Sequence, residues 1–352
     1  MSERSNFQSP LNISAEDLQR CHDLLGLASW KSLTGQRVFI TGGTGFIGKW
    51  LLATLLDADE VLGLNCHVTV LSRNPSAFER DWPKTSGRVN WVTGDVRSFP
   101  VHAHQFDVII HAATDVIAQA SPDDVFSTCH DGTRRVIELA RQCGASKLLL
   151  VSSGAVYGPL PIGMTHVPET YLGGPDPLLS GSAYGEGKRV SEWLASQGIN
   201  YGLKVKIARI FALVGPHLPL DKHFAIGNFL RAALVNEEIV IQGDGTPHRS
   251  YLYAADMAAW LWAILLRGVS GRAYNVGSDE SVSIYDLAKK VCNVLGCEPR
   301  VVLLQPKSEV IGSHYVPDIG RACNELGMLP PMPLDDAITR TARFHIGNSL
   351  KV

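Results

Sequence analysis

The sequence has no excess of either charge: 32 Lys and Arg residues stand against 34 Asp and Glu residues. A near-neutral chain gives no general reason to expect nucleic acid or an anionic membrane as a partner. Long apolar runs are also missing, since the nearest candidate, Met257–Leu266, is shorter than the ~20 residues of a membrane span and predicts a buried helix. The first 20 residues lack the apolar segment of a secretory signal, so we expect a cytoplasmic protein.

Cysteine and histidine pairs with metal-ligand spacing are scarce. The seven cysteines are scattered and include no CxxC pair, whereas a zinc ribbon or a secreted disulfide framework needs paired spacing. Reduced thiols fit this pattern better. His102 and His104 have no acidic neighbours to complete a ligand set, so no metal site is predicted.

From Gly35 onward, short apolar runs alternate with helical patterns. The chain of 352 residues is long enough for one large domain or two closely joined ones. Alternation of buried strands with helices predicts an α/β fold, a Rossmann-type doubly wound parallel sheet covered on both faces. The predicted strands are residues 37–40, 66–71, 89–92, 107–110, 147–151 and 204–210, and the predicted helices are residues 48–62, 122–143 and 184–196.

Three regions are predicted along the chain. Residues 1–34 are expected to form a helical extension, either a cap on the nucleotide domain or an oligomer contact, with Ser14 as N-cap and an apolar face of Leu18, Leu24, Leu25 and Leu27. Residues 35–215 with 250–277 are expected to form the dinucleotide-binding domain. Residues 216–249 with 278–345 are expected to form a smaller C-terminal α/β substrate lobe, with a helix at 224–236 and a strand at 239–242.

A glycine-rich segment, Thr41–Gly48 (TGGTGFIG), follows the first predicted strand and opens the first helix. Gly42 permits a tight turn, Gly45 lets the backbone approach a pyrophosphate, and Gly48 lets the helix pack on the strand. The exposed N–H groups and the positive end of the helix then hold phosphates. A structural turn is the alternative, but the strand-to-helix context favours a dinucleotide site. Its expected cofactor-binding residues are Thr41, Gly42, Thr44, Gly45, Phe46, Ile47 and Gly48.

The end of the second strand bears on the choice of cofactor. An NAD site usually has an acid here for the ribose 2′-OH, and the sequence Leu71-Ser-Arg-Asn74 has none. Arg73, helped by Ser72, is instead suited to a 2′-phosphate through charge-assisted hydrogen bonds, although a solvated surface arginine is the simpler interpretation. The sequence therefore predicts NADP(H), with NAD as the alternative.

Two further strand ends are candidates for cofactor contacts. Asp95, followed by Val96, is suited to accept a hydrogen bond from the adenine amino group or to cap a turn. His111 is followed by Ala112 and Ala113, small residues of the kind needed where backbone passes close to a cofactor. Packing alone explains that stretch equally well.

Residues suited to hydride chemistry stand at the fifth strand and the helix after it. Ser153 ends the strand at the carboxyl edge, where ligands bind in open α/β sheets. Tyr184 and Lys188 are four apart on a helix and so share one face. Because the phenol pKa is normally near 10, we expect Lys188 and the nicotinamide charge to lower it. The three residues then form a proton-transfer set for a carbinol or carbonyl.

With these motifs in order, the chain resembles the extended short-chain dehydrogenase/reductases of the NAD-dependent epimerase/dehydratase group, which act on nucleotide sugars. The similarity spans about residues 35–345 and includes residues 41–48 (TGGTGFIG), 94–96 (GDV), 111–113 (HAA), 152–158 (SSGAVYG), 184–188 (YGEGK), 243–258 (GDGTPHRSYLYAADMA) and 274–288 (YNVGSDESVSIYDLA). The resemblance implies that Ser153, Tyr184 and Lys188 are catalytic and that Arg249 grips the nucleotide diphosphate. It also implies a nucleoside-diphosphate-sugar substrate and a homodimer.

The departures from the group narrow the chemistry. Its 4,6-dehydratases carry an Asp-Glu pair, and its decarboxylases a glutamate, where this chain has Gly154 and Ala155. Both reactions are therefore disfavoured. Cys129 and Ala212 replace asparagines that are usual in the group, and His223 or Asn228 are candidates to supply the missing substrate contact.

The sequence leads to two enzyme hypotheses and one non-enzyme hypothesis. A 4-keto-sugar reductase using NADPH is favoured slightly, because Arg73 suits NADPH. A 4-epimerase with tightly held NAD(P)⁺ is the alternative, since the serine and tyrosine serve both reactions. A non-catalytic nucleotide-binding protein is the third hypothesis, which the intact Ser153, Tyr184 and Lys188 oppose.

Overall fold

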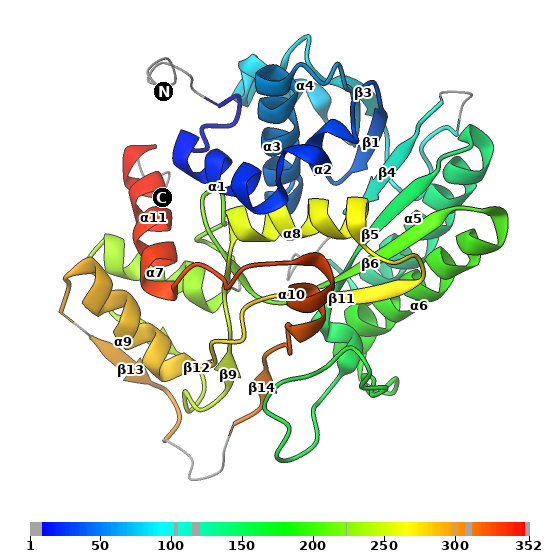
Figure 1. Ribbon diagram of the computed structural model, residues 1–352. Helices are drawn as coiled ribbons and strands as arrows, with labels where there is room; N and C mark the ends of the chain where they lie inside the picture. The colour runs from blue at the N-terminus through cyan, green and yellow to red at the C-terminus, as the bar shows by residue number, and fades with distance from the viewer. Residues whose placement is uncertain are drawn as a thin grey trace.

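A seven-stranded parallel sheet forms the centre of the molecule (Figure 1). The structure is a computed structural model that describes residues 9–101, 105–114, 120–222, 224–298, 300–306 and 312–348. The strand order is β11-β6-β5-β4-β1-β2-β3, and every neighbouring pair is parallel. The strands are β1 (Arg37–Thr41), β2 (His67–Ser72), β3 (Asn90–Thr93), β4 (Val108–His111), β5 (Lys147–Ser153), β6 (Lys204–Ile210) and β11 (Arg272–Val276).

Chain direction across the sheet reverses between β1 and β4, which are neighbours in space. At such a switch point the loops after the two strands diverge, and they leave a crevice at the carboxyl ends of the strands. The glycine-rich segment follows β1 and the HAA segment follows β4, so both predicted cofactor segments meet at this crevice.

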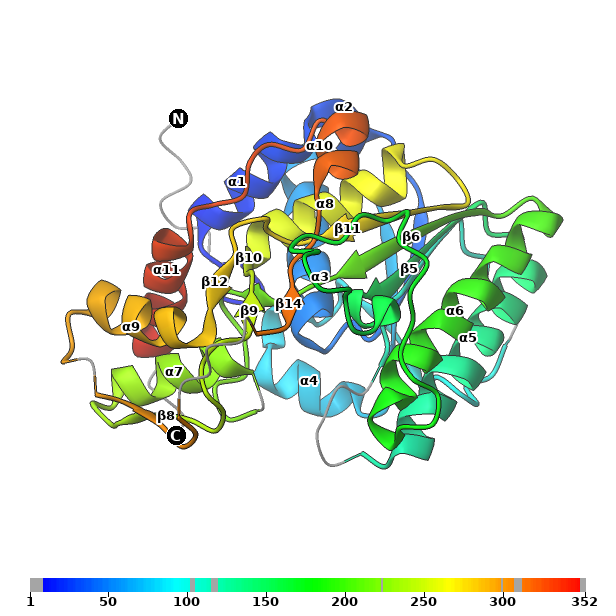
Figure 2. The ribbon, with the colours of Figure 1, turned by 90° about the horizontal axis from the view of Figure 1, so that it is seen from below.

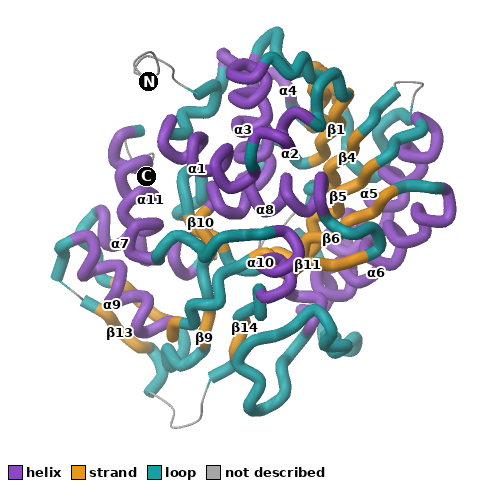
Figure 3. The backbone as a smooth tube through the Cα atoms, viewed as in Figure 1, coloured by secondary structure: helices purple, strands orange, loops and turns teal. Residues whose placement is uncertain are grey.

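Helices cover the sheet on both faces, because alternate residues of each buried strand point to opposite sides (Figures 1 and 3). On one face, Val38 and Ile110 pack with α3 (Phe46–Leu62) and α8 (Ala254–Arg267) in the larger core. On the other face, Phe39 and Ile109 pack with α5 (Pro122–Cys143) in a second core, and α6 (Ala183–Gln197) lies against α5.

The amino-terminal extension is part of the larger core. Helix α1 (Ala15–Leu25) lies across α8 and α3, and α2 (Leu27–Lys31) follows it (Figures 1 and 2). Trp30 is buried against Trp262, with ring centroids 5.5 Å apart, and Arg20 forms an ion pair with the buried Asp256. These contacts pack the extension against α3 and α8.

The carboxyl-terminal lobe lies beside the large sheet, and the described residues form three further small sheets (Figure 2). Strand β9 lies between β12 and β14, β13 pairs with β8, and β10 pairs with β7. The remaining elements are α4 (Pro75–Asp81), β7 (Leu213–Val214), α7 (Ala225–Leu234), β8 (Ile239–Ile241), β9 (His248–Arg249), β10 (Leu252–Tyr253), β12 (Val282–Ser283), α9 (Ile284–Leu295), β13 (Val301–Leu303), β14 (His314–Tyr315), α10 (Gly320–Leu326) and α11 (Leu334–Gly347).

The predicted fold class is confirmed, and most predicted elements lie within a few residues of the observed ones. Ser14 caps α1 as predicted, since its side chain accepts a hydrogen bond from the Asp17 N–H. The predicted apolar face is wrong at Leu27, which begins α2 and is exposed. The edge strand β11 was not among the predicted strands. None of the described helices combines the length and apolarity needed to cross a membrane.

Candidate active site

The glycine-rich loop leaves backbone where side chains would not fit. Gly42 has a φ of +72°, and a Cβ there would lie 2.6 Å from the backbone of Ala112 on the next strand's loop. A Cβ on Gly48 would lie 2.1 Å from the carbonyl oxygen of Gly42. Gly45 is the N-cap of α3, with no side chain over the first turn of the helix. The loop therefore presents bare N–H groups and the positive helix end to a ligand, which fits a dinucleotide pyrophosphate.

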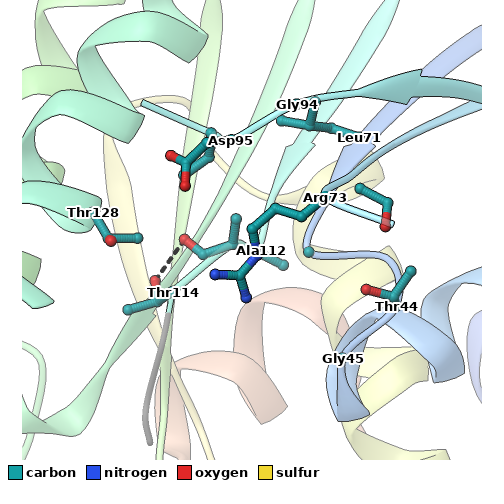
Figure 4. Close-up of a pocket in the computed structure, with 13 residues that line it drawn as sticks. Thr44, Gly45, Leu71, Arg73, Gly94, Asp95, Ala112, Thr114 and Thr128 are labelled. Carbon is teal, nitrogen blue, oxygen red and sulfur yellow. Dashed lines mark hydrogen bonds between the residues drawn. The ribbon is translucent and has the colours of Figure 1, made fainter. Parts of the chain in front are cut away.

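A pocket opens beside this loop at the carboxyl edge of the sheet (Figure 4). Of the residues predicted to bind cofactor, its lining includes Gly42, Thr44, Gly45, Ser72, Arg73, Asp95, Val96, Ala112 and Ala113. Thr114 and Thr128 complete the far wall and were not predicted. Four separate loops thus converge on one site. Thr41, Phe46, Ile47 and His111 lie next to the pocket in β1, α3 and β4 but not in its lining.

Arg73 and Asp95 both line the pocket, from the ends of the neighbouring strands β2 and β3. Figure 4 shows the Arg73 guanidinium extending into the pocket from the end of β2. Asp95 instead receives two side-chain hydrogen bonds from Arg97, at 2.9 and 3.0 Å, which with the nearby Arg73 hold the pKa of its carboxyl below the ordinary value. The Arg97 N–H also donates to Asp95 at 2.9 Å, so Asp95 caps this turn while lining the pocket.

The predicted catalytic residues meet at the end of β5. Ser153 is buried at the strand end, and its hydroxyl lies near enough to the phenol of Tyr184 to influence the pKa of that phenol. Lys188 lies one turn further along α6, with its ammonium 5.9 Å from the centroid of the Tyr184 ring. The ammonium donates to Thr114 Oγ1 at 2.6 Å and to the Val151 carbonyl at 2.9 Å. The structure therefore brings all three predicted residues together.

Comparison with known proteins decides the family. The family model described as "NAD dependent epimerase/dehydratase family" matches residues 38–277, more than half of the chain. The chain belongs to this family. The glycine-rich segment and Ser153, Tyr184 and Lys188 all lie inside the matched segment.

Individual relatives are distant but similar along most of their length. The chain is 28% identical over 315 residues to UDP-glucuronic acid decarboxylase 1 of Xenopus tropicalis, covering 88% of this chain and 72% of the relative. It is 30% identical over 314 residues to UDP-glucuronic acid decarboxylase 1 of Arabidopsis thaliana, covering 86% and 68%. A dTDP-glucose 4,6-dehydratase from Streptomyces venezuelae, solved with NAD and TYD bound, is 25% identical with a TM-score of 0.76, covering 89% of this chain and 97% of that chain.

Burial acts on the pKa of the Tyr184 phenol in the direction opposite to that expected from Lys188 and a nicotinamide charge. Burial raises the pKa of the Tyr184 phenol above its ordinary value, and the nearby Ser153 hydroxyl opposes this only in part. Lys188 directs its hydrogen bonds to Thr114 and Val151, and burial lowers the pKa of its ammonium. The phenol is accordingly protonated at neutral pH, ready to donate.

His111, predicted to bind cofactor, lies in a buried chain of hydrogen bonds. Its Nδ1 lies 2.8 Å from Thr41 Oγ1, and its Nε2 lies 3.1 Å from Thr133 Oγ1. Thr133 donates to Ser191, so Nε2–H of His111 donates to Thr133 and Nδ1 accepts from Thr41. These hydrogen bonds connect β1 and β4, which precede the predicted cofactor segments, to α5 and α6. Tyr184 lies in α6.

The neutral state of His111 predicts loss of stability in acid. Burial lowers its pKa to about 3, whereas an unfolded histidine titrates near 6.5. Below pH 6.5 the unfolded state therefore binds a proton that the native state does not. The free energy of unfolding then decreases as the pH decreases. We expect His111 to cost about 2 kcal/mol of unfolding free energy between pH 6.5 and 5.

Urea unfolding of wild type and His111→Asn at both pH values measures this loss. The variant should show a smaller fall with pH, although it is less stable throughout because two hydrogen bonds are lost. His67→Asn, at the exposed start of β2, is the matched control. An equal fall with pH in wild type and His111→Asn would contradict the assignment.

Two further predicted substrate residues, Arg249 and Asn228, lie in β9 and α7. Arg249, in β9, donates to the carbonyls of His248 at 2.8 Å and Ser313 at 3.4 Å. Its guanidinium carbon lies 5.7 Å from the ring centroid of Tyr315, which in turn approaches Ser153. Asn228 is half-buried in α7, and His223 lies outside the described residues.

Position 154 has neighbours that sequence reasoning missed. Gly154 follows Ser153 and begins a short 3₁₀ turn, Gly154–Tyr157, packed against Phe211 and Tyr315. No local pattern identifies Tyr315, because β14 has two residues and lies far along the chain. Cys129, in place of the usual asparagine, is buried beside Lys188 and hydrogen-bonded to Thr114.

No metal ligand set is found among the described residues: no three His, Cys, Asp or Glu side chains converge there. His102 and His104 lie outside that part of the chain. All seven cysteines carry free thiols.

Proposed function

We propose that the protein is an NADPH-dependent reductase of a nucleoside-diphosphate 4-keto sugar. One observation carries the proposal: the catalytic edge holds a serine hydroxyl and a protonated phenol, and residues 154 and 155 are Gly and Ala. Elimination of water and decarboxylation in the group use an acid in this segment. Proton donation to a carbonyl needs none, and Tyr184 with Ser153 suffices for it.

Each catalytic residue has a distinct task in this reaction. A bound nicotinamide dinucleotide supplies the hydride. Tyr184 donates its phenolic proton to the carbonyl oxygen of the sugar, and Ser153 donates a hydrogen bond to the same oxygen. The Lys188 ammonium, 5.9 Å from the ring centroid, stabilises the phenolate that remains. Arg249 is suited to the diphosphate of the substrate, since its guanidinium matches phosphate geometry.

Ser153 and Tyr184 can serve a reductase and a 4-epimerase equally well, so the preference for a reductase rests on the cofactor pocket. Arg73, which extends into the cofactor pocket, supports NADPH as the reductant.

The names of the relatives suggest other reactions, which the site argues against. The relatives include UDP-glucuronic acid decarboxylases and a dTDP-glucose 4,6-dehydratase. From these relatives we infer a nucleotide-sugar substrate for this chain. We do not infer their reactions, because positions 154 and 155 lack the acid. From the family resemblance we also infer a homodimer, and from the composition a cytoplasmic location.

The state of the cofactor in purified protein tests the proposal. Freshly purified protein is denatured, any released dinucleotide is identified by mass, and stripped protein is titrated with NADPH and NADH. A reductase should be purified without stoichiometric cofactor, bind NADPH reversibly and prefer it to NADH. Stoichiometric NAD(P)⁺ carried through purification would instead indicate a cofactor recycled in place, as in the 4-epimerase. Binding without turnover on a panel of UDP-, dTDP-, CDP- and GDP-linked 4-keto sugars would support a non-catalytic protein.

A further inference from the structure

The space that a side chain at position 154 would need is already filled. A Cβ on Gly154 would lie 2.7 Å from two ring carbons of Phe211 and 2.8 Å from the hydroxyl of Tyr315. Such approaches lie well inside van der Waals contact, and close-packed interiors adjust to them only at a cost. The packing around position 154 therefore leaves no room for an acidic side chain there.

The lobe holds Tyr315 in this place. Strands β14 and β9 pair in parallel, with Tyr315 opposite Arg249. The Arg249 guanidinium lies over one side of the Tyr315 ring, and Phe211 packs on the ring with centroids 4.7 Å apart. Tyr315 is thus fixed by the residue suited to the diphosphate of the substrate and by the segment after β6.

The Tyr315 hydroxyl also reaches the catalytic serine. Its oxygen lies 3.5 Å from Ser153 Oγ, across 162 residues of sequence. The Ala155 N–H donates to Ser153 Oγ at 3.1 Å, and the Tyr315 hydroxyl donates to the Ile210 carbonyl at 3.5 Å, which leaves its oxygen free to accept from Ser153. Burial keeps this phenol protonated by raising its pKa. Ser153 therefore lies between two phenols, Tyr184 from the nucleotide domain and Tyr315 from the lobe.

Long hydrogen bonds in a ligand-free site commonly tighten when the substrate binds. A contact between Ser153 and Tyr315 would then restrict the serine hydroxyl to the orientation in which it faces the substrate oxygen. Arg249 lies against the same ring, so a diphosphate bound by Arg249 would act directly on the position of Tyr315.

We propose that Tyr315 is a positioning residue for Ser153 and that, with Phe211, it excludes a side chain from position 154. The positioning role rests on the proposed reduction, because it is exercised through Ser153. The exclusion does not depend on which reaction the site performs. The lobe, as well as residues 154 and 155, then keeps the site free of an acid.

The exclusion is tested by stability alone. Gly154→Ala is made in wild type and in Tyr315→Ala, where the vacated ring space lets Phe211 move. The expected result is a fall in the urea unfolding midpoint that is at most half as large in the Tyr315→Ala background. Gly181→Ala is the control, since a Cβ there meets nothing within 4 Å. Equal falls in both backgrounds would overturn the exclusion.

The positioning role is tested by kinetics. Tyr315→Phe keeps the ring and removes only the hydroxyl, so we expect kcat to fall about 5- to 20-fold with KM and NADPH affinity within twofold of wild type. In a Ser153→Ala background the same change should have no further effect. A rise in KM at unchanged kcat, or an equal loss without Ser153, would overturn the role. Tyr201→Phe, at an exposed side chain after α6, is the control.

Failure of the proposed function gives a different result. If wild type reduces no 4-keto sugar of the panel, the reductase proposal is wrong, and the positioning role, having no reaction to serve, falls with it. The stability cycle still decides whether Tyr315 excludes a side chain at position 154.

Discussion

Tyr184→Phe should lower turnover by a factor on the order of 10²–10⁴ while leaving NADPH affinity within about twofold. The variant removes the only atom that can deliver a proton from this ring, and it retains the half-buried ring beside Lys188. Steady-state kinetics and NADPH titration measure the two quantities separately.

The pH dependence of the same enzyme gives a second check on this residue. Because burial raises the pKa of the Tyr184 phenol, the donor stays protonated through neutral pH. Wild-type kcat should therefore not decline between pH 6 and 8 through loss of this proton, and the residual activity of Tyr184→Phe should be equally flat. Tyr201→Phe, at an exposed site after α6, should match wild type in all respects. Turnover unchanged by Tyr184→Phe would remove this tyrosine from the mechanism.

The sheet and the cofactor loop were predictable because their signals are local. Buried strands such as β4 and β5 contain continuous apolar runs, and the glycines of Thr41–Gly48 stand directly between a strand and a helix. Tyr184 and Lys188 are related by one helical turn. Each of these patterns is specified within a few residues, so the sequence alone indicates it.

The relations across the sheet were not predictable from local pattern. The contact of Tyr315 with Ser153 depends on pairing between two-residue strands of the lobe. The sequence likewise did not indicate that His111 would bond to Thr41 and Thr133, because those partners come from β1 and α5. The raised pKa of Tyr184 follows from burial, which depends on the assembled fold.

The choice between NADPH and NADH depends on charge at the end of β2. Arg73 and Ser72 line the cofactor pocket, where an NAD site usually has an acid. Asp95, a carboxylate in the same lining, is paired with Arg97 and so opposes a bound phosphate less than a free carboxylate would. A charge-assisted hydrogen bond to phosphate contributes about 1.5–3 kcal/mol, and reversal of the charge adds repulsion.

Arg73→Glu should therefore weaken NADPH binding by about 10²-fold or more and change NADH binding by less than about threefold. NADH lacks the 2′-phosphate, so it reports any general damage to the pocket. Arg80→Glu on α4, where the arginine side chain is 77% exposed, alters the net charge by the same amount at a distance from the lining and should affect neither cofactor. Fluorescence titration of stripped wild type and both variants with NADPH and NADH, at two salt concentrations, measures the affinities. The loss of NADPH affinity caused by Arg73→Glu should shrink as salt rises. Parallel losses for NADPH and NADH would discard the 2′-phosphate assignment, and with it the argument from Arg73 for a reductase.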